Sequence, residues 1–192
     1  MIRPGFIVEG DLEYEVIKKL CPKCPTPLLG INGNDVELEA IAKHIGTQAR
    51  ILESKYCNPI IVILDREGRK ETSDEIICRL HRALEGQDLK SKIIIGVPDR
   101  MIENWILADL KTLRRSTGIS KRRCKINYEG VHGKEALKKI LPPKIRYRET
   151  IEGACWLARS VSRTIYQNSA SFKTFADKLR NIPCPWVAGC RS

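Results

Sequence analysis

The chain has 192 residues, of which 42% are hydrophobic, and its 34 lysines and arginines exceed its 23 acidic residues, giving a formal net charge of +11. Ordinary apolar content without low-complexity tracts excludes a disordered chain, and the longest apolar run, residues 60–64, is far too short for a membrane span. The eight cysteines occur without the signal peptide and turn-rich composition of a secreted disulfide scaffold. We therefore expect a cytoplasmic globular protein outside the membrane.

Strand and helix patterns alternate along the first 110 residues. Strands are predicted from short β-branched or apolar runs, and helices from apolar residues three or four positions apart. Asp11 and Asp35 stand where helix caps are expected. The predicted strands cover residues 6–8, 60–64 and 93–97, and the predicted helices lie over 11–20, 35–54 and 76–84. This alternation predicts a three-layer, Rossmann-like α/β domain with a mostly parallel sheet over residues 1–110.

The pattern changes beyond residue 110. Few strand signals remain, and helices are expected near residues 136–141, 149–165 and 172–181. The segment from Lys111 to Arg148 contains 13 basic residues and two acids, whereas the rest of the chain is balanced at 21 of each. We therefore expect a basic, mainly helical annex over residues 111–192, packed on the α/β domain.

Concentrated positive charge is typical of a surface that binds a polyanion, because lysine and arginine replace the counterions of nucleic acid. The alternative is a solvated basic face that only aids solubility. The nucleic-acid-binding candidates are Arg114, Arg115, Lys121, Arg122, Arg123, Lys125 and Lys134.

Acidic side chains follow the ends of all three predicted strands. Glu9 ends the first, Asp65 and Glu67 follow the second, and Asp99 and Glu103 follow the third. The carboxyl ends of parallel strands meet at one edge of a sheet, so these acids should be neighbours. Clustered carboxylates repel one another, and a hard divalent cation removes that cost. The sequence therefore predicts a magnesium site at this edge.

Asp65 and Glu67 are two residues apart. If the backbone stays extended there, both side chains point to one side, and Gly68 then allows a tight turn. Asp99 has a simpler interpretation as the cap of a helix that begins near Arg100. Trp105 lies among apolar residues and is expected in the core.

Cysteine spacing offers a second, weaker metal hypothesis. Cys21 and Cys24 form one CxxC pair that could supply two ligands to a structural zinc ion. The other pair, Cys184 and Cys190, has a different spacing. The alternative is a loop without metal.

Two motifs resemble a known family. Residues 6–13, FIVEGDLE, followed by residues 61–68, IVILDREG, are similar to the TOPRIM domain of topoisomerases, bacterial primases and nucleases of the OLD type. Residues 102–109, IENWILAD, and 169–175, SASFKTF, resemble the small stand-alone TOPRIM proteins grouped as DUF4276. The resemblance spans most of residues 5–110 and the segment near 169–180.

The resemblance implies roles for individual residues. The first-motif glutamate, an acid/base or metal ligand, matches Glu9, and the Asp-x-Asp metal motif matches Asp65 and Glu67, where the second aspartate is replaced by glutamate. That replacement puts ideal octahedral coordination in doubt. The catalytic set implied is Glu9, Asp65, Glu67, Glu103 and Lys173, and the set for Mg²⁺ or Mn²⁺ is Glu9, Glu13, Asp65, Glu67 and Glu103.

The function that follows is a Mg²⁺-dependent nuclease that hydrolyses phosphodiesters of DNA or RNA, with DNA favoured. By likeness alone, such proteins belong to prokaryotic defence systems and work beside a separate ATPase. The alternative is a non-catalytic nucleic-acid-binding or regulatory module with a TOPRIM-like site. The sequence does not determine the oligomeric state.

Overall fold

A computed structural model of the chain describes residues 3–31, 36–125, 127–182 and 184–190, with only the backbone described at residues 123, 185, 188 and 189. Its centre is a three-stranded parallel sheet in the order β1 (Gly5–Val8), β2 (Ile60–Ile63) and β3 (Ile93–Gly96). Phe6 pairs with Ile61, which pairs with Ile94. The prediction of an α/β fold with a parallel sheet is confirmed.

Helices make up most of the remaining regular structure. The α-helices are α1 (Asp11–Leu20), α2 (Leu38–Ser54), α3 (Ser73–Glu85), α4 (Glu103–Ala108), α5 (Leu110–Thr117), α6 (Gly133–Ile140), α7 (Ala154–Arg159), α8 (Ser162–Asn168) and α9 (Ala170–Lys178). Shorter helical turns occupy Lys121–Arg123, Glu149–Gly153 and Pro185–Cys190. None of the helices in the described part of the chain combines the length and apolar composition that crossing a bilayer requires.

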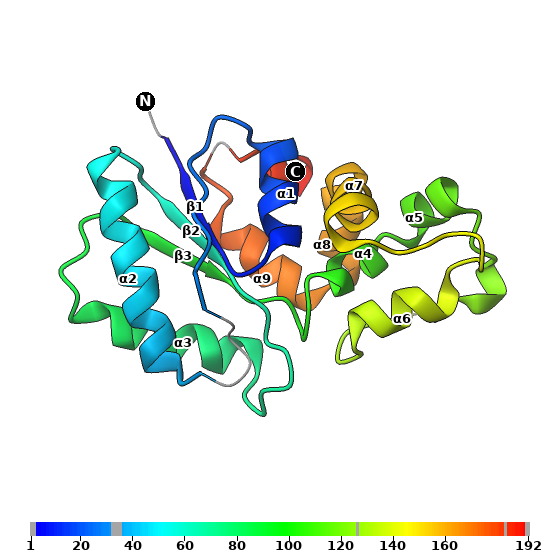
Figure 1. Cartoon of the computed structure of the whole chain (residues 1–192), viewed down its shortest axis with the longest axis horizontal. Coiled ribbons are helices and arrows are strands. Elements are labelled where there is room, and N and C mark those ends of the chain that lie inside the picture. The colour runs from blue at the N-terminus through cyan, green and yellow to red at the C-terminus, as the bar shows by residue number, and fades with distance from the viewer. Residues whose placement is uncertain (1–2, 32–35, 126, 183, 191–192) are drawn as a thin grey trace.

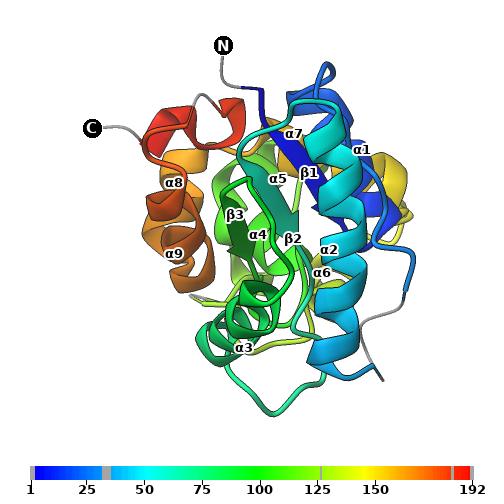
Figure 2. The ribbon, with the colours of Figure 1, turned by 90° about the vertical axis from the view of Figure 1, so that its left-hand side faces the viewer.

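Alternation along the strands creates two cores, one on each face of the sheet. Ile7, Val62 and Ile95 point toward α2 and α3, whereas Phe6 and Ile61 point toward the opposite face. Figures 1 and 2 show α2 and α3 covering one face, with α1 and α9 on the other. The three-layer prediction for the sheet and its helices matches this arrangement, because successive residues of a strand face opposite sides.

Residues from the C-terminal part of the chain complete the core on the α1 side. Trp105 is fully buried, as expected, and its ring lies 5.4 Å from that of Phe175 and 5.5 Å from that of Trp186. Phe172 meets the same indole edge to face at 5.1 Å. The same core cluster contains Trp156 of α7, Ile165 of α8 and Phe6 of β1, so helices α7 to α9 share a core with the sheet. A boundary between residues 110 and 111 stays a prediction.

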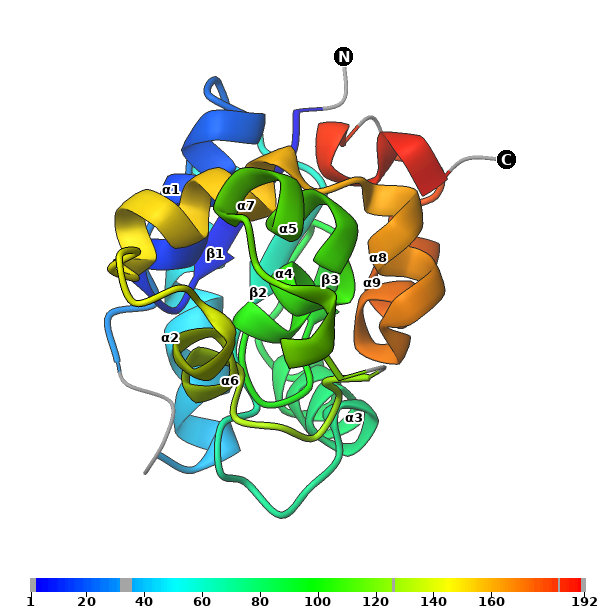
Figure 3. The ribbon, with the colours of Figure 1, turned by 90° about the vertical axis from the view of Figure 1, so that its right-hand side faces the viewer.

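Helices α4 to α6 lie beyond the carboxyl ends of the strands. Figures 1 and 3 show α5 and α6 at the end of the molecule farthest from α2. The free edge of β1 is covered, since Phe6 N–H donates to Pro25 O at 2.9 Å and Leu29 N–H donates to Val8 O at 2.7 Å. Covering this edge prevents strand pairing with other molecules.

The predicted helix over 149–165 is interrupted. A π-helical turn over Glu149–Gly153 leads into α7, and the chain is extended between α7 and α8. Buried Asp109 holds this break, because its Oδ2 accepts the Val161 N–H at 2.8 Å. Periodicity alone does not reveal such a long-range contact.

The expected helix caps are wrong in two cases. Gly10 is the N-cap of α1, and Asp11 is its first helical residue. Asp99 does not cap α4, whose N-cap is Ile102. Instead Asp99 pairs with Arg66 at 2.9 Å and accepts the Gly130 N–H. The third expected cap, Asp35, lies outside the described residues.

Gly96 allows α9 to pack directly on β3. A Cβ at this position would lie 2.5 Å from the Phe175 ring. We expect Gly96→Ala to destabilise the fold by about 1–3 kcal/mol through overpacking. Urea unfolding should show this loss of stability. In a Phe175→Leu background, Gly96→Ala should cost less, because the smaller side chain leaves room for the added Cβ.

Gly86→Ala is the matched control, because a Cβ there meets nothing within 4 Å. Its stability should stay within about 1 kcal/mol of wild type. Equal losses in the two alanine variants would contradict the packing argument.

Candidate functional site

Carboxylates tie the ends of the parallel strands together. Glu9 follows β1, and its Oε2 accepts the Asp65 N–H at 2.9 Å just beyond β2. Asp65 Oδ1 in turn accepts the Ile102 N–H at 2.9 Å, at the start of α4. Both acceptors bind amides with no partner in the sheet or helix, so the acids organise the backbone around them.

Two helices contribute further buried acids. Glu13 on α1 is 4% exposed, and Glu103 on α4 is 2% exposed. Glu103 Oε1 accepts the hydroxyl of Tyr147 at 2.9 Å. Tyr147 is itself held by stacking on Trp156, with 5.8 Å between ring centroids.

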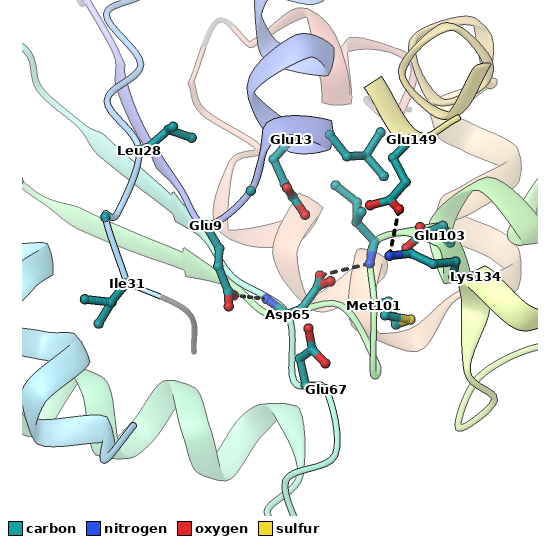
Figure 4. Close-up of a pocket in the computed structure, with 14 residues that line it drawn as sticks. Glu9, Glu13, Leu28, Ile31, Asp65, Glu67, Met101, Glu103, Lys134 and Glu149 are labelled. Atoms are coloured by element: carbon teal, nitrogen blue, oxygen red, sulfur yellow. Dashed lines mark hydrogen bonds and ion pairs between the residues drawn. The ribbon is translucent and has the colours of Figure 1, made fainter. Parts of the chain in front are cut away.

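These acids line one cavity of about 450 Å³ at the carboxyl edge of the sheet. Figure 4 shows the carboxyl groups of Glu9, Glu13, Asp65 and Glu67 around a common space, with Glu103, Lys134 and Glu149 on its other side. The structure thus brings together all five residues of the predicted metal set. The complete lining consists of Glu9, Gly10, Leu12, Glu13, Leu28, Gly30, Ile31, Asp65, Glu67, Met101, Ile102, Glu103, Lys134 and Glu149.

Glu67 reaches the cavity by a different backbone path from the expected one. Its φ of 58° is left-handed, so the backbone is not extended from Asp65 to Glu67. Glu67 N–H donates to Arg100 O at 2.6 Å, which fixes this conformation. The expectation of extended spacing is therefore wrong, and Glu67 rather than Gly68 supplies the left-handed turn residue.

Burial and mutual repulsion favour the protonated forms of these acids. Burial, with the nearby charges of Glu9 and Glu103, raises the pKa of Glu13 from its ordinary value near 4.5 to about 8. Burial also raises the pKa of Asp65 well above its usual range, reinforced by Glu13 and Glu103. The pKa of Glu103 is raised by burial as well. The cavity therefore favours positive charge.

Lys134 is the one basic residue among the described residues that line the cavity. Its Nζ lies 2.8 Å from Glu149 Oε1. Burial acts to lower the pKa of Lys134, but Glu149, Glu103 and Glu67 outweigh it and the net shift is upward. Lys134, predicted as a nucleic-acid contact, thus lies inside the acidic site.

Sequence reasoning missed Tyr147 and Glu149. Both lie in or just after the basic segment, where no motif marks them. The segment after α6 brings them there, where the Tyr147 hydroxyl donates to Glu103 and Glu149 pairs with Lys134. The only available signal was the pair of acids, Glu149 and Glu152, that follows a long basic stretch.

The donor set fits a hard divalent cation, although the side chains do not converge on one point. Within the described ranges, no three His, Cys, Asp or Glu residues are placed to hold a metal ion together. Mg²⁺ typically uses one or two carboxylates and keeps several waters, which a 450 Å³ acidic cavity can hold. The raised pKa values of Glu13 and Asp65 show the electrostatic cost that such a cation would relieve.

The other predicted site residues lie elsewhere. Lys173 is on the exposed face of α9, 5.7 Å from the Tyr166 ring centroid, and it does not line the acidic cavity. The side chain of Arg123 lies outside the described part of the structure. The exposed basic candidates on α5 and after it are Arg114, Arg115, Lys121, Arg122 and Lys125.

The CxxC pair lies next to Cys184, one member of the other cysteine pair in the sequence. The Cys21 thiol hydrogen bonds with Cys184, which together with burial raises its pKa. Burial also raises the pKa of Cys24, reinforced by Cys184. No described group of cysteines and histidines is arranged to hold a metal, so zinc at Cys21 and Cys24 stays a prediction.

Comparisons with known proteins add no assignment. The chain matches no protein family model, and neither curated proteins nor solved structures show significant similarity to it.

The buried acids should make stability depend on pH. Between about pH 4.5 and 8 the folded protein keeps a proton on Glu13 that the unfolded chain releases, so the free energy of unfolding falls as pH rises. Each pKa unit corresponds to about 1.4 kcal/mol. In urea unfolding with EDTA, we expect Glu13→Gln to exceed wild type by on the order of 2 kcal/mol at pH 8, and the gain to shrink near pH 5.

Glu85→Gln on the exposed face of α3 serves as the control and should show no such pH-dependent gain. A Glu13→Gln variant whose stability tracks wild type from pH 5 to pH 8 would contradict a raised pKa.

Proposed function

We propose that the protein is a metal-dependent nuclease of the TOPRIM type that hydrolyses phosphodiester bonds of nucleic acid. The observation that carries this proposal is the meeting of Glu9, Glu13, Asp65, Glu67 and Glu103 in one cavity at the carboxyl edge of a parallel sheet. In α/β folds this edge is where active sites form. The resemblance to TOPRIM motifs agrees with this placement.

Glu9, Asp65 and Glu67 follow the carboxyl ends of the strands and would hold Mg²⁺ or Mn²⁺, and Glu13 and Glu103 line the same cavity from α1 and α4. A divalent cation at this site would lower the pKa of bound water and neutralise charge on the phosphate. The Asp65 and Glu9 carboxylates are held by backbone amides, so they need little reorganisation. Such rigid placement suits catalysis that depends on positioning.

Hydrolysis joins a water oxygen to phosphorus and breaks the bond from phosphorus to one ester oxygen. The water gives up a proton, and the leaving oxygen takes one up. Glu13 has a pKa raised to about 8. A cation at this site would displace its proton, and the Glu13 carboxylate would then be able to accept the proton that water gives up. Lys134 supplies a fixed positive charge on the opposite wall, and the Tyr147 hydroxyl orients Glu103.

Nucleic acid is the proposed substrate, with DNA favoured over RNA. Arg114 and Arg115 are exposed on α5 and Arg122 in the turn after it. Figures 1 and 3 show α5 beyond the carboxyl edge of the sheet. A role in prokaryotic defence beside a separate ATPase rests on the family resemblance.

A non-catalytic nucleic-acid-binding module is the second candidate. The observation in its favour is that no three potential ligands converge within the described residues. In that case the acidic cavity would be regulatory, and the basic segment would be the working surface.

Cleavage assays separate the two candidates. With Mg²⁺ or Mn²⁺, we expect wild type to cut plasmid or single-stranded DNA, and Glu9→Gln or Asp65→Asn to lower the rate by about a hundredfold or more because each removes a cation ligand. DNA binding in EDTA should persist in both variants. Gel electrophoresis of the products measures the rate.

The matched control is Glu85→Gln, which removes the same charge from an exposed position on α3 and should leave the rate unchanged. If wild type binds DNA but does not cut it in the presence of any divalent ion tested, the binding-module candidate replaces the nuclease.

The basic surface makes a separate prediction. Lys121 and Arg122 are exposed in the turn after α5. Reversing both to glutamate should weaken binding of all DNA sequences and lower the slope of log affinity against log salt by about two, because two phosphate contacts are lost. Fluorescence anisotropy at several salt concentrations measures the slope; an unchanged slope would place the nucleic acid elsewhere.

A further inference from the structure

A second cavity lies directly beside the acidic one. It has a volume of about 200 Å³ and is lined by Glu67, Gly68, Arg100, Met101 and His132. Glu67 and Met101 belong to both cavities, so the two share a wall. The second cavity adds Arg100 and His132 to the carboxylate of Glu67.

Arg100 is fixed in place at this cavity. Its φ of 71° is left-handed, and its carbonyl accepts the Glu67 N–H at 2.6 Å while its Nε donates to Glu67 O at 3.4 Å. These reciprocal bonds join the loops that follow β2 and β3. Within the described residues Arg100 forms no ion pair, so its terminal guanidinium nitrogens remain available for an anion.

His132 also belongs to the lining. It is the N-cap residue of α6, and its Nδ1 is buried without a hydrogen-bond partner among the described residues. Buried polar atoms are normally hydrogen-bonded, so an unpaired one calls for a partner that the protein itself does not supply.

The basic lining continues past His132. A third cavity of about 310 Å³ is also lined by His132, together with Lys125 and Lys139, one acid, Glu135, and the largely apolar side chains of Tyr128, Val131, Ala136 and Ile140. Shared residues therefore connect three cavities in a row, from the acidic site through Arg100 and His132 to Lys125 and Lys139. Arg100, Lys125 and Lys139 thus lie along a row of cavities that starts at the proposed catalytic site, and such spaced cations suit a polymer with repeated negative charges.

We propose that the cavity between Arg100 and His132 is a phosphate subsite, which holds the backbone phosphate next to the one cleaved in the acidic cavity. The inference rests on the proposed function and names the substrate contact of that site. The 200 Å³ volume equals about seven waters at roughly 30 Å³ each, enough for a phosphate group. Arginine suits this role because its planar guanidinium binds two phosphate oxygens at once.

Binding in EDTA tests the subsite without requiring catalysis. The probe is a short fluorescein-labelled single-stranded DNA, followed by fluorescence anisotropy. We expect Arg100→Gln to weaken binding by about fivefold or more and to reduce the salt slope by about one. His132→Gln should weaken binding less, and it probes the subsite independently if Arg100→Gln fails to fold, which thermal unfolding would reveal.

Arg82→Gln on α3 is the matched control, since it removes an exposed arginine from a different face and should leave binding unchanged. Inorganic phosphate alone should compete with the DNA more strongly in wild type than in Arg100→Gln. Unchanged DNA affinity in both Arg100→Gln and His132→Gln would overturn the subsite, whatever their competition with inorganic phosphate.

Failure of the subsite and failure of the nuclease are distinguishable. Weaker DNA binding by Arg100→Gln in a protein that never cleaves supports the subsite and removes the nuclease. Normal binding by both subsite variants in a protein that cleaves removes the subsite and leaves the nuclease standing.

Discussion

Burial of several carboxylates at one edge of a short sheet is the constraint on which the rest of this structure depends. Each carboxylate loses hydration there and faces neighbours of the same charge. Backbone amides offset part of this cost, because Glu9 accepts the Asp65 N–H and Asp65 accepts the Ile102 N–H. The same hydrogen bonds fix how β1, β2 and α4 meet. The carboxylates whose burial lowers the stability of the fold therefore also define the geometry of the site.

A sheet of three four-residue strands is too small to form that site alone. One wall comes from α1 through Glu13, and another from α4 and α6 through Glu103 and Lys134. Those helices are held by a core to which the end of the chain contributes, with Phe172 and Phe175 packed on Trp105. The C-terminal residues thus act on the site at a distance, by fixing the elements that carry its side chains.

Local pattern was enough to predict the three strands and the gathering of Glu9, Asp65 and Glu103, because parallel strand ends must meet at one edge. It could not predict the backbone conformation that brings Glu67 into the cavity, since its left-handed φ is fixed by a hydrogen bond to Arg100 in another loop. Lys134 entered the acidic site for a similar reason: docking of α6 on α4 is a tertiary contact with no periodic signature. Sequence spacing therefore predicted which residues follow the strand ends better than it predicted which other side chains line the cavity.

The acids at this site lower the stability of the fold through repulsion, and Lys134 offsets part of that repulsion. Its charge faces Glu149, Glu103 and Glu67, so it partly neutralises the cavity before any cation enters. Glu13 and Asp65 reduce the remaining repulsion by holding protons, as their raised pKa values indicate. A cation that displaced those protons would bind the folded chain far better than the unfolded one, and binding of that kind stabilises the fold. The repulsion among these carboxylates is therefore the same free energy that would favour binding of a divalent ion, and through it of a phosphate.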